Sequence, residues 1–153
     1  MNERAPNAGL VKVFPKVLEE MAFLFAELDE PGDACEVPGD AVAVTIEFNG
    51  ARTGKFELGV PIALGQEISA NLLGTETGAV KDVAAAYDAL GELANVTCGN
   101  LLREIAGDKP VFNLSTPRVA PLNARAWISM ASAPDTAVFT VDGHRVLARH
   151  ELN

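Results

Sequence analysis

Residues 87–106, YDALGELANVTCGNLLREIA, predict one long amphipathic helix around which the rest of the chain is organised. At about 100° per residue, one side of this helix collects polar or small residues, namely Asp88, Glu92, Asn95 and Gly99. The other side is mainly apolar and carries Leu90, Leu93, Ala94, Thr97, Leu101 and Ile105. This separation is typical of a helix with one face in a core and the other in water. We place its start near Ala79 and its end before Gly107.

The polar side departs from an ordinary solvated face, which usually mixes Lys with Glu. It holds two carboxylates, a carboxamide and a glycine, and its first three residues follow the pattern D-x3-E-x2-N. Asn and Gly are unfavourable in a helix interior, so the presence of Asn95 and Gly99 in the middle of this helix requires an explanation. The competing interpretation is an ordinary exposed face, because a Glu there is common and an Asn costs less than about 1 kcal/mol.

The pattern resembles the signature of the CheC/CheX/FliY phosphatases of bacterial chemotaxis, and it is most similar to CheX-like members with a single motif. In that family an Asp or Ser, a Glu and an Asn stand at these spacings, and a Pro follows further along. Here Pro117 follows Asn95 after 21 intervening residues, one residue short of the family spacing. The resemblance implies a phosphatase whose substrate is a phosphorylated CheY-type response regulator.

The resemblance also implies roles for the residues of the polar side. Asn95 would place the attacking water, because its amide can accept one hydrogen of the water and donate elsewhere. Glu92 would pair with a lysine beside the phosphorylated aspartate of the partner. Independently of the resemblance, Gly99 has no side chain and would let the partner backbone come close, one turn beyond Asn95. The role of Asp88 is less defined: it would orient the helix or shape the contact. No metal or cofactor of its own is implied, since the receiver domain supplies Mg²⁺.

Length and composition favour a single domain over residues 1–153, with residues 1–12 frayed. The net charge of −9 argues against nucleic-acid binding and suits a basic protein surface as partner. The first residues lack a signal-peptide hydrophobic stretch, and no run of about 20 apolar residues predicts a membrane span. Two isolated thiols, Cys35 and Cys98, fit a reducing compartment. We therefore expect a cytoplasmic protein that binds neither nucleic acid nor membrane.

A second long helix is predicted at residues 13–29, with Pro15 in its first turn. Its expected buried face carries Phe14, Val17, Leu18, Met21, Phe25 and Leu28. Phe23 lies on the opposite, polar side, where an aromatic ring gains nothing from water. We therefore expect a protein contact, such as the partner in a homodimer, to cover Phe23.

The two predicted helices resemble each other in sequence. The segment VLEEMAF at 17–23 matches ALGELAN at 89–95, so that Glu20 aligns with Glu92 and Phe23 with Asn95. This similarity indicates an internal repeat whose first copy has lost the carboxamide. Chance similarity between two amphipathic helices is the alternative.

The remaining chain predicts a hairpin, a short helix and several strands. Alternating apolar residues at 42–48 and 56–62 flank a turn opened by Asn49-Gly50, which predicts a β-hairpin. A short helix is expected at 64–73, with Gly74 as its stop and a loop, TETG, at 75–78. Further strands are expected at 111–115, 124–131, 137–141 and 144–149, the last two joined by the Asp142-Gly143 turn.

This order predicts an α+β domain in which two long helices pack on a mainly antiparallel β-sheet. The pseudo-repeat agrees with the CheC-like fold that the resemblance implies. Other candidate sites lack the necessary groups: His144 and His150 have no carboxylate cluster at metal-ligand spacing, and Cys98 points to the apolar side.

Our first hypothesis is therefore a response-regulator phosphatase. The alternative is a non-catalytic module that docks on receiver domains or serves as a scaffold in chemotaxis or two-component signalling. A small-molecule hydrolase would need a concave pocket with perturbed titratable groups, for which the sequence offers no residues. If the first hypothesis holds, Glu92 and Asn95 should be exposed, with no cavity around them.

Overall fold

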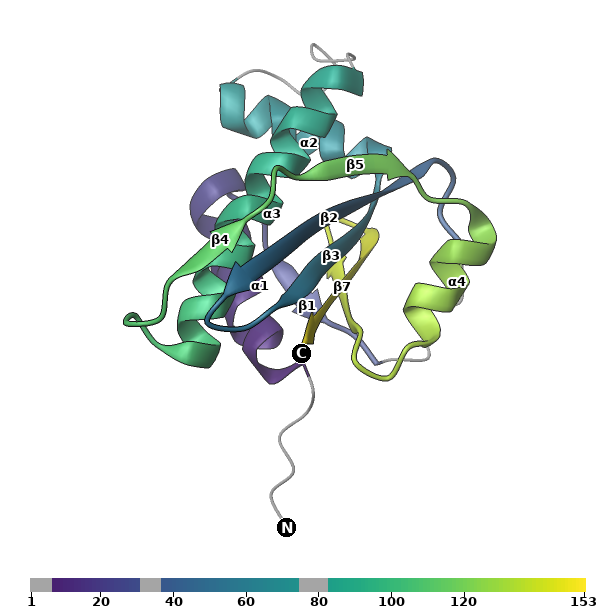
Figure 1. Cartoon of the computed structure of the whole chain (residues 1–153). Helices are drawn as coiled ribbons and strands as arrows, with labels where there is room; N and C mark the ends of the chain where they lie inside the picture. Colours follow the sequence, from purple (N-terminus) through teal and green to yellow (C-terminus); the bar gives the residue numbers. More distant parts are fainter. Residues whose placement is uncertain (1–6, 31–36, 75–82) are drawn as a thin grey trace.

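The computed structural model describes residues 7–30, 37–74 and 83–153 (Figure 1). In chain order its elements are α1 (Ala8–Ala22), β1 (Ala26–Leu28), β2 (Ala41–Gly50), β3 (Gly54–Pro61), α2 (Ile62–Leu73), α3 (Val83–Ala106), β4 (Phe112–Leu114), β5 (Arg118–Pro121), α4 (Ala124–Ser132), β6 (Ala137–Val141) and β7 (His144–Leu152). The predicted helix start near Ala79, the loop at 75–78 and Cys35 lie outside the described residues.

Within the described residues, the strands form one seven-stranded sheet in the order β1-β6-β7-β3-β2-β4, and β5 continues along the same edge of β2 as β4. Every strand pair is antiparallel. The prediction of an α+β fold with two long helices on an antiparallel sheet is therefore confirmed. In the part of the chain that the structure describes, we find no helix with the length and apolar character that crossing a membrane requires.

Two halves of the chain repeat the same topology. α1 is followed by β1, β2 and β3, and α3 is followed by β4–β5, β6 and β7. If each strand is replaced by its counterpart in the other half, the same sheet order is obtained in the reverse direction. β3 and β7 meet at the centre of the sheet. The first strand of each half pairs with the hairpin of the other, β1 with β6 and β5 with β2. The predicted repeat is thus present in the topology, and α2 and α4 are additions to it.

α1 and α3 cover one face of the sheet and enclose the main core with it (Figure 1). The alternating residues of the β2–β3 hairpin point into this core, as predicted, and all are buried: Val42, Val44, Ile46, Phe48, Phe56, Leu58 and Val60. α4 covers the opposite face, where Trp127, Val138 and Leu147 belong to a second, smaller cluster. The two clusters place α3 and α4 on different sides of the molecule.

The first helix begins five residues earlier than predicted and ends seven residues earlier, at Ala8–Ala22 instead of 13–29. Residues 8–12 are helical and not frayed, because Leu10 is fully buried and anchors the first turns to the core. Pro15 consequently lies inside the helix and not in its first turn. Residues 1–6 lie outside the described residues.

The same helix ends early, because Phe23 adopts the left-handed conformation at φ 57° and stops it. The Nδ2 of Asn71 donates to the carbonyl of Ala22 at 2.8 Å, which satisfies a carbonyl that the ended helix leaves free. The chain then enters the edge strand β1. Phe25 and Leu28, which were predicted in the core, are therefore 69% and 55% exposed.

Residues 124–131 form helix α4, and the strand predicted there is wrong. The Oδ1 of Asn123 accepts a hydrogen bond from the N–H of Ala126 at 2.8 Å, which caps the helix. Trp127, Met130 and Ala131 recur at helical spacing and pack against the second cluster. An Asn cap before this spacing is the signal that the strand prediction overlooked. The short edge strands β1 and β5 were not predicted either.

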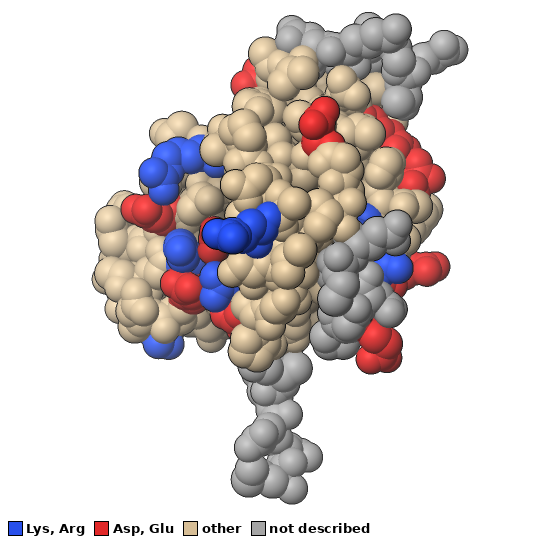
Figure 2. All heavy atoms as spheres, turned by 90° about the vertical axis from the view of Figure 1, so that its right-hand side faces the viewer, with Lys and Arg blue, Asp and Glu red and all other residues tan. Residues whose placement is uncertain are grey.

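Figure 2 shows the side of the molecule that carries α4, where basic and acidic side chains are interspersed. On this side of the sheet, Arg149 of β7 pairs with Glu151 at 3.0 Å, Asp135 at 3.1 Å and Glu57 at 3.3 Å. Burial lowers the pKa of the Arg149 guanidinium, but the hydrogen bond and charge of Asp135 and the other two carboxylates raise it overall. This network links Asp135, which precedes β6, to β3 and β7. We therefore regard it as structural.

Candidate functional site

α3 presents the predicted polar residues to solvent. Asp88, Glu92 and Asn95 are exposed, and Gly99 is half-exposed. The predicted apolar side is buried at Leu90, Leu93, Ala94, Thr97 and Leu101. Ile105 is the exception at 38% exposed, because it lies in the last turn, beside the start of α1. Gly107, at φ 83°, then ends the helix with its N–H donating to the carbonyl of Arg103 at 2.8 Å.

Glu92 and Asn95 lie on the same turn of α3. Residues three apart on a helix are surface neighbours, so both side chains leave the helix toward the same side. Among the residues that the structure describes, neither side chain has a hydrogen-bonding or ion-pairing partner. Both are therefore available to a bound molecule.

The two side chains line an open groove of about 610 Å³ between α3 and the edge of the sheet. α3 contributes Tyr87, Asp88, Gly91, Glu92 and Asn95, and the segment 114–119 forms the other wall. Exposure of the motif pair is as expected, but the expectation that no cavity surrounds it is wrong. The sequence could not show that residues 114–119 run alongside the motif helix.

The groove brings together three of the four predicted site residues. Asp88, Glu92 and Asn95 line it, whereas Gly99 does not. A Cβ added to Gly99 would meet nothing within 4 Å, so the backbone there faces open space. Gly99 is thus placed where a large partner could approach the helix closely, one turn beyond Asn95.

The second wall of the groove is held against α3 and β2. A Cβ added to Gly91 would lie 3.5 Å from the Cβ of Pro117, so the proline packs directly on the bare helix surface. The N–H of Ser115 donates to the carbonyl of Glu47 at 2.8 Å, and the N–H of Glu47 donates to Ser115 Oγ at 2.9 Å. Sequence reasoning noted Pro117 for its spacing but missed Ser115 and Thr116, because only strand register places them here. It also missed Tyr87, although this residue stands on α3 beside Asp88.

The chemistry available in the groove is limited to carboxylates, a carboxamide and hydroxyls. No Lys, Arg or His is among the described residues that line it, so Asp88 and Glu92 make it acidic. Cys98 lies on the buried side of α3, where burial raises the pKa of its thiol to about 12. A protonated, inaccessible thiol cannot serve as a nucleophile. The arrangement suits the orientation of a water molecule and the attraction of a cationic side chain.

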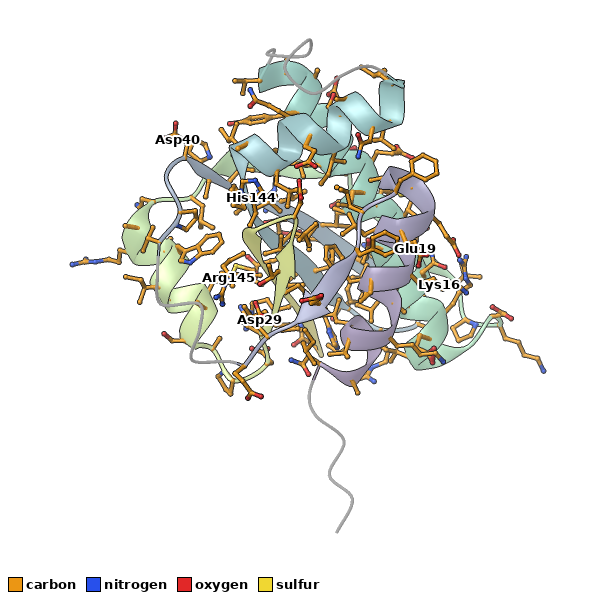
Figure 3. All side chains as sticks on the ribbon, turned by 180° about the vertical axis from the view of Figure 1, so that it is seen from behind. Lys16, Glu19, Asp29, Asp40, His144 and Arg145 are labelled. Atoms are coloured by element: carbon orange, nitrogen blue, oxygen red, sulfur yellow. The ribbon has the colours of Figure 1, made fainter. Side chains whose placement is uncertain are left out.

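The first copy of the repeat does not build a second such site. Glu20 of α1 is exposed, as Glu92 is, but the helix ends at Ala22 and its counterpart to Asn95 is the left-handed Phe23. Figure 3 shows Lys16 and Glu19 on the outer side of α1. Asp29 at the end of β1 faces Arg145, with Asp29 Oδ2 3.3 Å from Arg145 Nη1. The half that contains α1 has therefore kept the topology and lost the motif.

Solved structures of known proteins share the fold over nearly the whole chain. Chemotaxis protein CheX from Vibrio vulnificus is similar with a TM-score of 0.71 and 20% identity, covering 100% of both chains. CheX from Desulfovibrio desulfuricans gives 0.69 and 14% identity over 97% of this chain and 99% of that chain. A third, from the CheX-CheY-BeF3-Mg²⁺ complex of Borrelia burgdorferi, gives 0.65 and 15% identity over 95% of this chain and 96% of that chain.

These likenesses place the chain in the class of α+β proteins with the CheC-like fold. A model of the chemotaxis phosphatase CheX family matches residues 42–126, more than half of the chain. The chain therefore belongs to the CheX family, and the resemblance drawn from the motif is confirmed. A comparison with curated protein sequences gives no match.

Proposed function

We propose that this chain dephosphorylates the aspartyl phosphate of a CheY-type response regulator by positioning the attacking water. The observation that carries the proposal is the exposed pair Glu92 and Asn95, side by side on α3 in an open groove and without hydrogen-bonding or ion-pairing partners among the described residues. Membership of the chemotaxis phosphatase family supports it, as does the complex of the Borrelia burgdorferi relative with CheY.

In this mechanism the chain supplies no covalent intermediate. The oxygen of water attacks the phosphorus, the bond from phosphorus to the aspartate oxygen breaks, and the carboxylate leaves with inorganic phosphate as the second product. The amide oxygen of Asn95 accepts one hydrogen of the water and holds its lone pair toward the phosphorus. Since a carboxamide is not a base at neutral pH, the proton passes to the departing phosphate.

Glu92 has a different task, which is to hold the regulator in place. Its carboxylate pairs with a lysine near the phosphorylated aspartate, and the second carboxylate, on Asp88, adds to the negative potential of the groove. The partner receiver domain supplies the divalent ion, Mg²⁺, that neutralises the phosphoryl oxygens. The chain needs no cofactor of its own in this scheme.

We further propose that the chain acts as a homodimer in the cytoplasm, where phosphorylated receivers occur. An exposed apolar set at the end of α1 and along β1, namely Phe23, Phe25 and Leu28, supports a protein contact at that edge. This edge belongs to α1 and β1, whereas the groove lies between α3 and segment 114–119.

The test is whether catalytic amounts of the protein shorten the lifetime of a phosphorylated receiver. A purified CheY-type regulator is phosphorylated with a small acyl-phosphate donor, the donor is removed, and decay of the phosphoaspartate is followed with and without the chain. We expect one molecule of the chain to turn over many regulators. Unchanged decay with a regulator that binds the chain would show a docking module and overturn the proposal.

A further inference from the structure

The strand formed by β4 and β5 contains a β-bulge beside the motif helix. Both segments pair antiparallel with β2, with Leu114 opposite Phe48 and Arg118 opposite Thr45. Between these pairs, the three residues 115–117 face only two residues of β2, so one residue is extra. A bulge re-aims side chains at a sheet edge, and such features recur next to functional sites.

The bulge is fixed on both sides of Thr116. Before it, Ser115 exchanges two hydrogen bonds with the backbone of Glu47, at 2.8 and 2.9 Å. After it, Pro117 packs on Gly91 of α3, and a proline has no N–H to lose from the strand ladder. Thr116 itself is exposed and lines the groove that Glu92 and Asn95 line from the other wall. Its backbone is therefore held while its side chain stays free for solvent or a partner.

We propose that Thr116 is a docking residue for the response regulator, contacting it on the wall of the groove opposite the motif helix. The inference rests on the proposed function and adds a second point of contact to it. A regulator that brings its phosphoaspartate to Asn95 covers the groove between α3 and the bulge, where the Thr116 hydroxyl can donate one hydrogen bond and accept others. A contact on a pre-fixed backbone costs little ordering on binding.

Thr116 is a positioning residue in this proposal and not a catalytic one. It touches the body of the regulator and not the phosphoryl group, so its contribution is present before and during the chemical step. Changing it should raise the regulator concentration needed for half-maximal rate and leave the maximal rate nearly unchanged. A loss of fold would instead lower the maximal rate and the melting temperature together.

The experiment compares Thr116→Gln, which extends a neutral side chain into the groove, with Thr116→Ser, which keeps the hydroxyl. Ser129→Gln is the matched control, because Ser129 is an exposed hydroxyl residue on α4, on the opposite side of the sheet. Dephosphorylation rates are measured against regulator concentration. Binding is measured separately by calorimetry with the regulator carrying BeF3 and Mg²⁺, a stable mimic of its phosphorylated form.

We expect Thr116→Gln to weaken regulator binding and raise KM by about tenfold with kcat within about twofold, while Thr116→Ser and Ser129→Gln stay close to the unchanged protein. Thr116→Ala, which removes the hydroxyl without adding bulk, should fall between them and serves if the glutamine variant does not fold. Unaltered KM and affinity for both Thr116→Gln and Thr116→Ala would overturn the inference. An unchanged protein that lacks phosphatase activity would instead sink the proposed function, whatever Thr116 does.

Discussion

Pro117 packs on the bare backbone of Gly91, with only 3.5 Å between the Cβ of the proline and the position that a Cβ on Gly91 would occupy. Gly91 immediately precedes Glu92 in α3, and Pro117 closes the bulge that forms the facing wall. The width of the groove at the motif is therefore set by this contact. A methyl group would still fit at ordinary van der Waals distance, whereas a larger side chain at position 91 would have to displace Pro117.

Replacing Gly91 by residues of increasing size should separate helix stability from groove geometry. Gly91→Ala adds a methyl group at ordinary van der Waals distance and removes a helix-interior glycine, so we expect about 0.5–1 kcal/mol of added stability and full activity. Gly91→Leu cannot fit without displacing Pro117, so it should lower phosphatase activity. Urea unfolding and dephosphorylation rates check both variants, and a leucine variant with the unchanged rate would show that the contact does not shape the site.

Phe23 should contribute to a homodimer interface. It is 73% exposed and adopts a left-handed conformation, which at helix ends is usually occupied by Gly and sometimes by Asn, so neither burial nor local geometry favours a Phe there. We expect Phe23→Ala to weaken dimerisation in sedimentation experiments. Phe23→Gly should weaken it too while relieving the backbone, so that the monomer becomes slightly more stable.

The discriminating result for Phe23 is the combination of the two measurements. A dimer as strong as that of the unchanged protein in both variants would exclude Phe23 from the interface. Since the motif groove lies on α3 and not on α1, regulator binding per subunit should change little in either variant.

Glu67 should make stability depend on pH. Burial, a hydrogen bond with Asp142 and the charge of Asp142 raise the pKa of the Glu67 carboxyl from 4.5 to about 7. The folded state therefore binds a proton that the unfolded state releases between these values, and this contribution to stability is lost as pH rises from about 4.5 to about 7. Glu67→Gln keeps a neutral side chain at every pH. We expect it to melt above the unchanged protein at pH 8 and to shrink the pH dependence.

Glu19, which is exposed on α1, provides a matched control for this experiment. Glu19→Gln should leave the dependence of melting temperature on pH as it is. If Glu67→Gln and the unchanged protein differ equally at pH 5 and pH 8, the carboxyl does not titrate as described.

Much of the fold could be predicted because it depends on local patterns. The period of two at 42–48 and the helical period at 87–106 both report which side faces the core, and both were confirmed. The failures arose where tertiary context decides. Phe25 and Leu28 have helical spacing from Phe14, but one left-handed residue, Phe23, ends the helix before them. Residues 124–131 contain β-branched and aromatic side chains, yet an Asn cap makes them a helix.

The candidate site also has one part that could be predicted from local sequence and one part that could not. The spacing of Glu92 and Asn95 within one helix fixes their common side, so the motif wall could be predicted. The opposite wall could not, because it depends on a register between β2 and a segment some 70 residues away. A single extra residue at 115–117 moves Thr116 into the groove, and no local signal reports an extra residue in a strand whose partner is unknown.

Glu92 should act through binding, in a way that salt modulates. Its carboxylate lies beside Asp88 in a groove, and none of the described residues that line this groove is cationic. The charge of Glu92 is therefore uncompensated until a lysine of the regulator binds. We expect Glu92→Gln to weaken binding and activity together, with a loss that shrinks as ionic strength rises. Titration of regulator at low and high salt checks this. A loss that is independent of salt would argue against a charge pair.

Asn95 should act through the chemical step. If it orients the attacking water, its contribution appears only as the transition state forms, so Asn95→Ala should lower kcat by on the order of 10²-fold and leave regulator affinity nearly intact. Folding should be unaffected, since Asn95 is exposed and substitutions at such positions usually stay within about 0.5 kcal/mol. Asn100, five residues further along α3, is the matched control: its Nδ2 donates to the carbonyl of Val96 and its Oδ1 accepts from Arg103, both at 2.8 Å, so its amide is already engaged within α3. Asn100→Ala should keep full turnover. If Asn95→Ala also keeps full turnover with a cognate phosphorylated regulator, α3 is a docking surface and the water is placed by other groups.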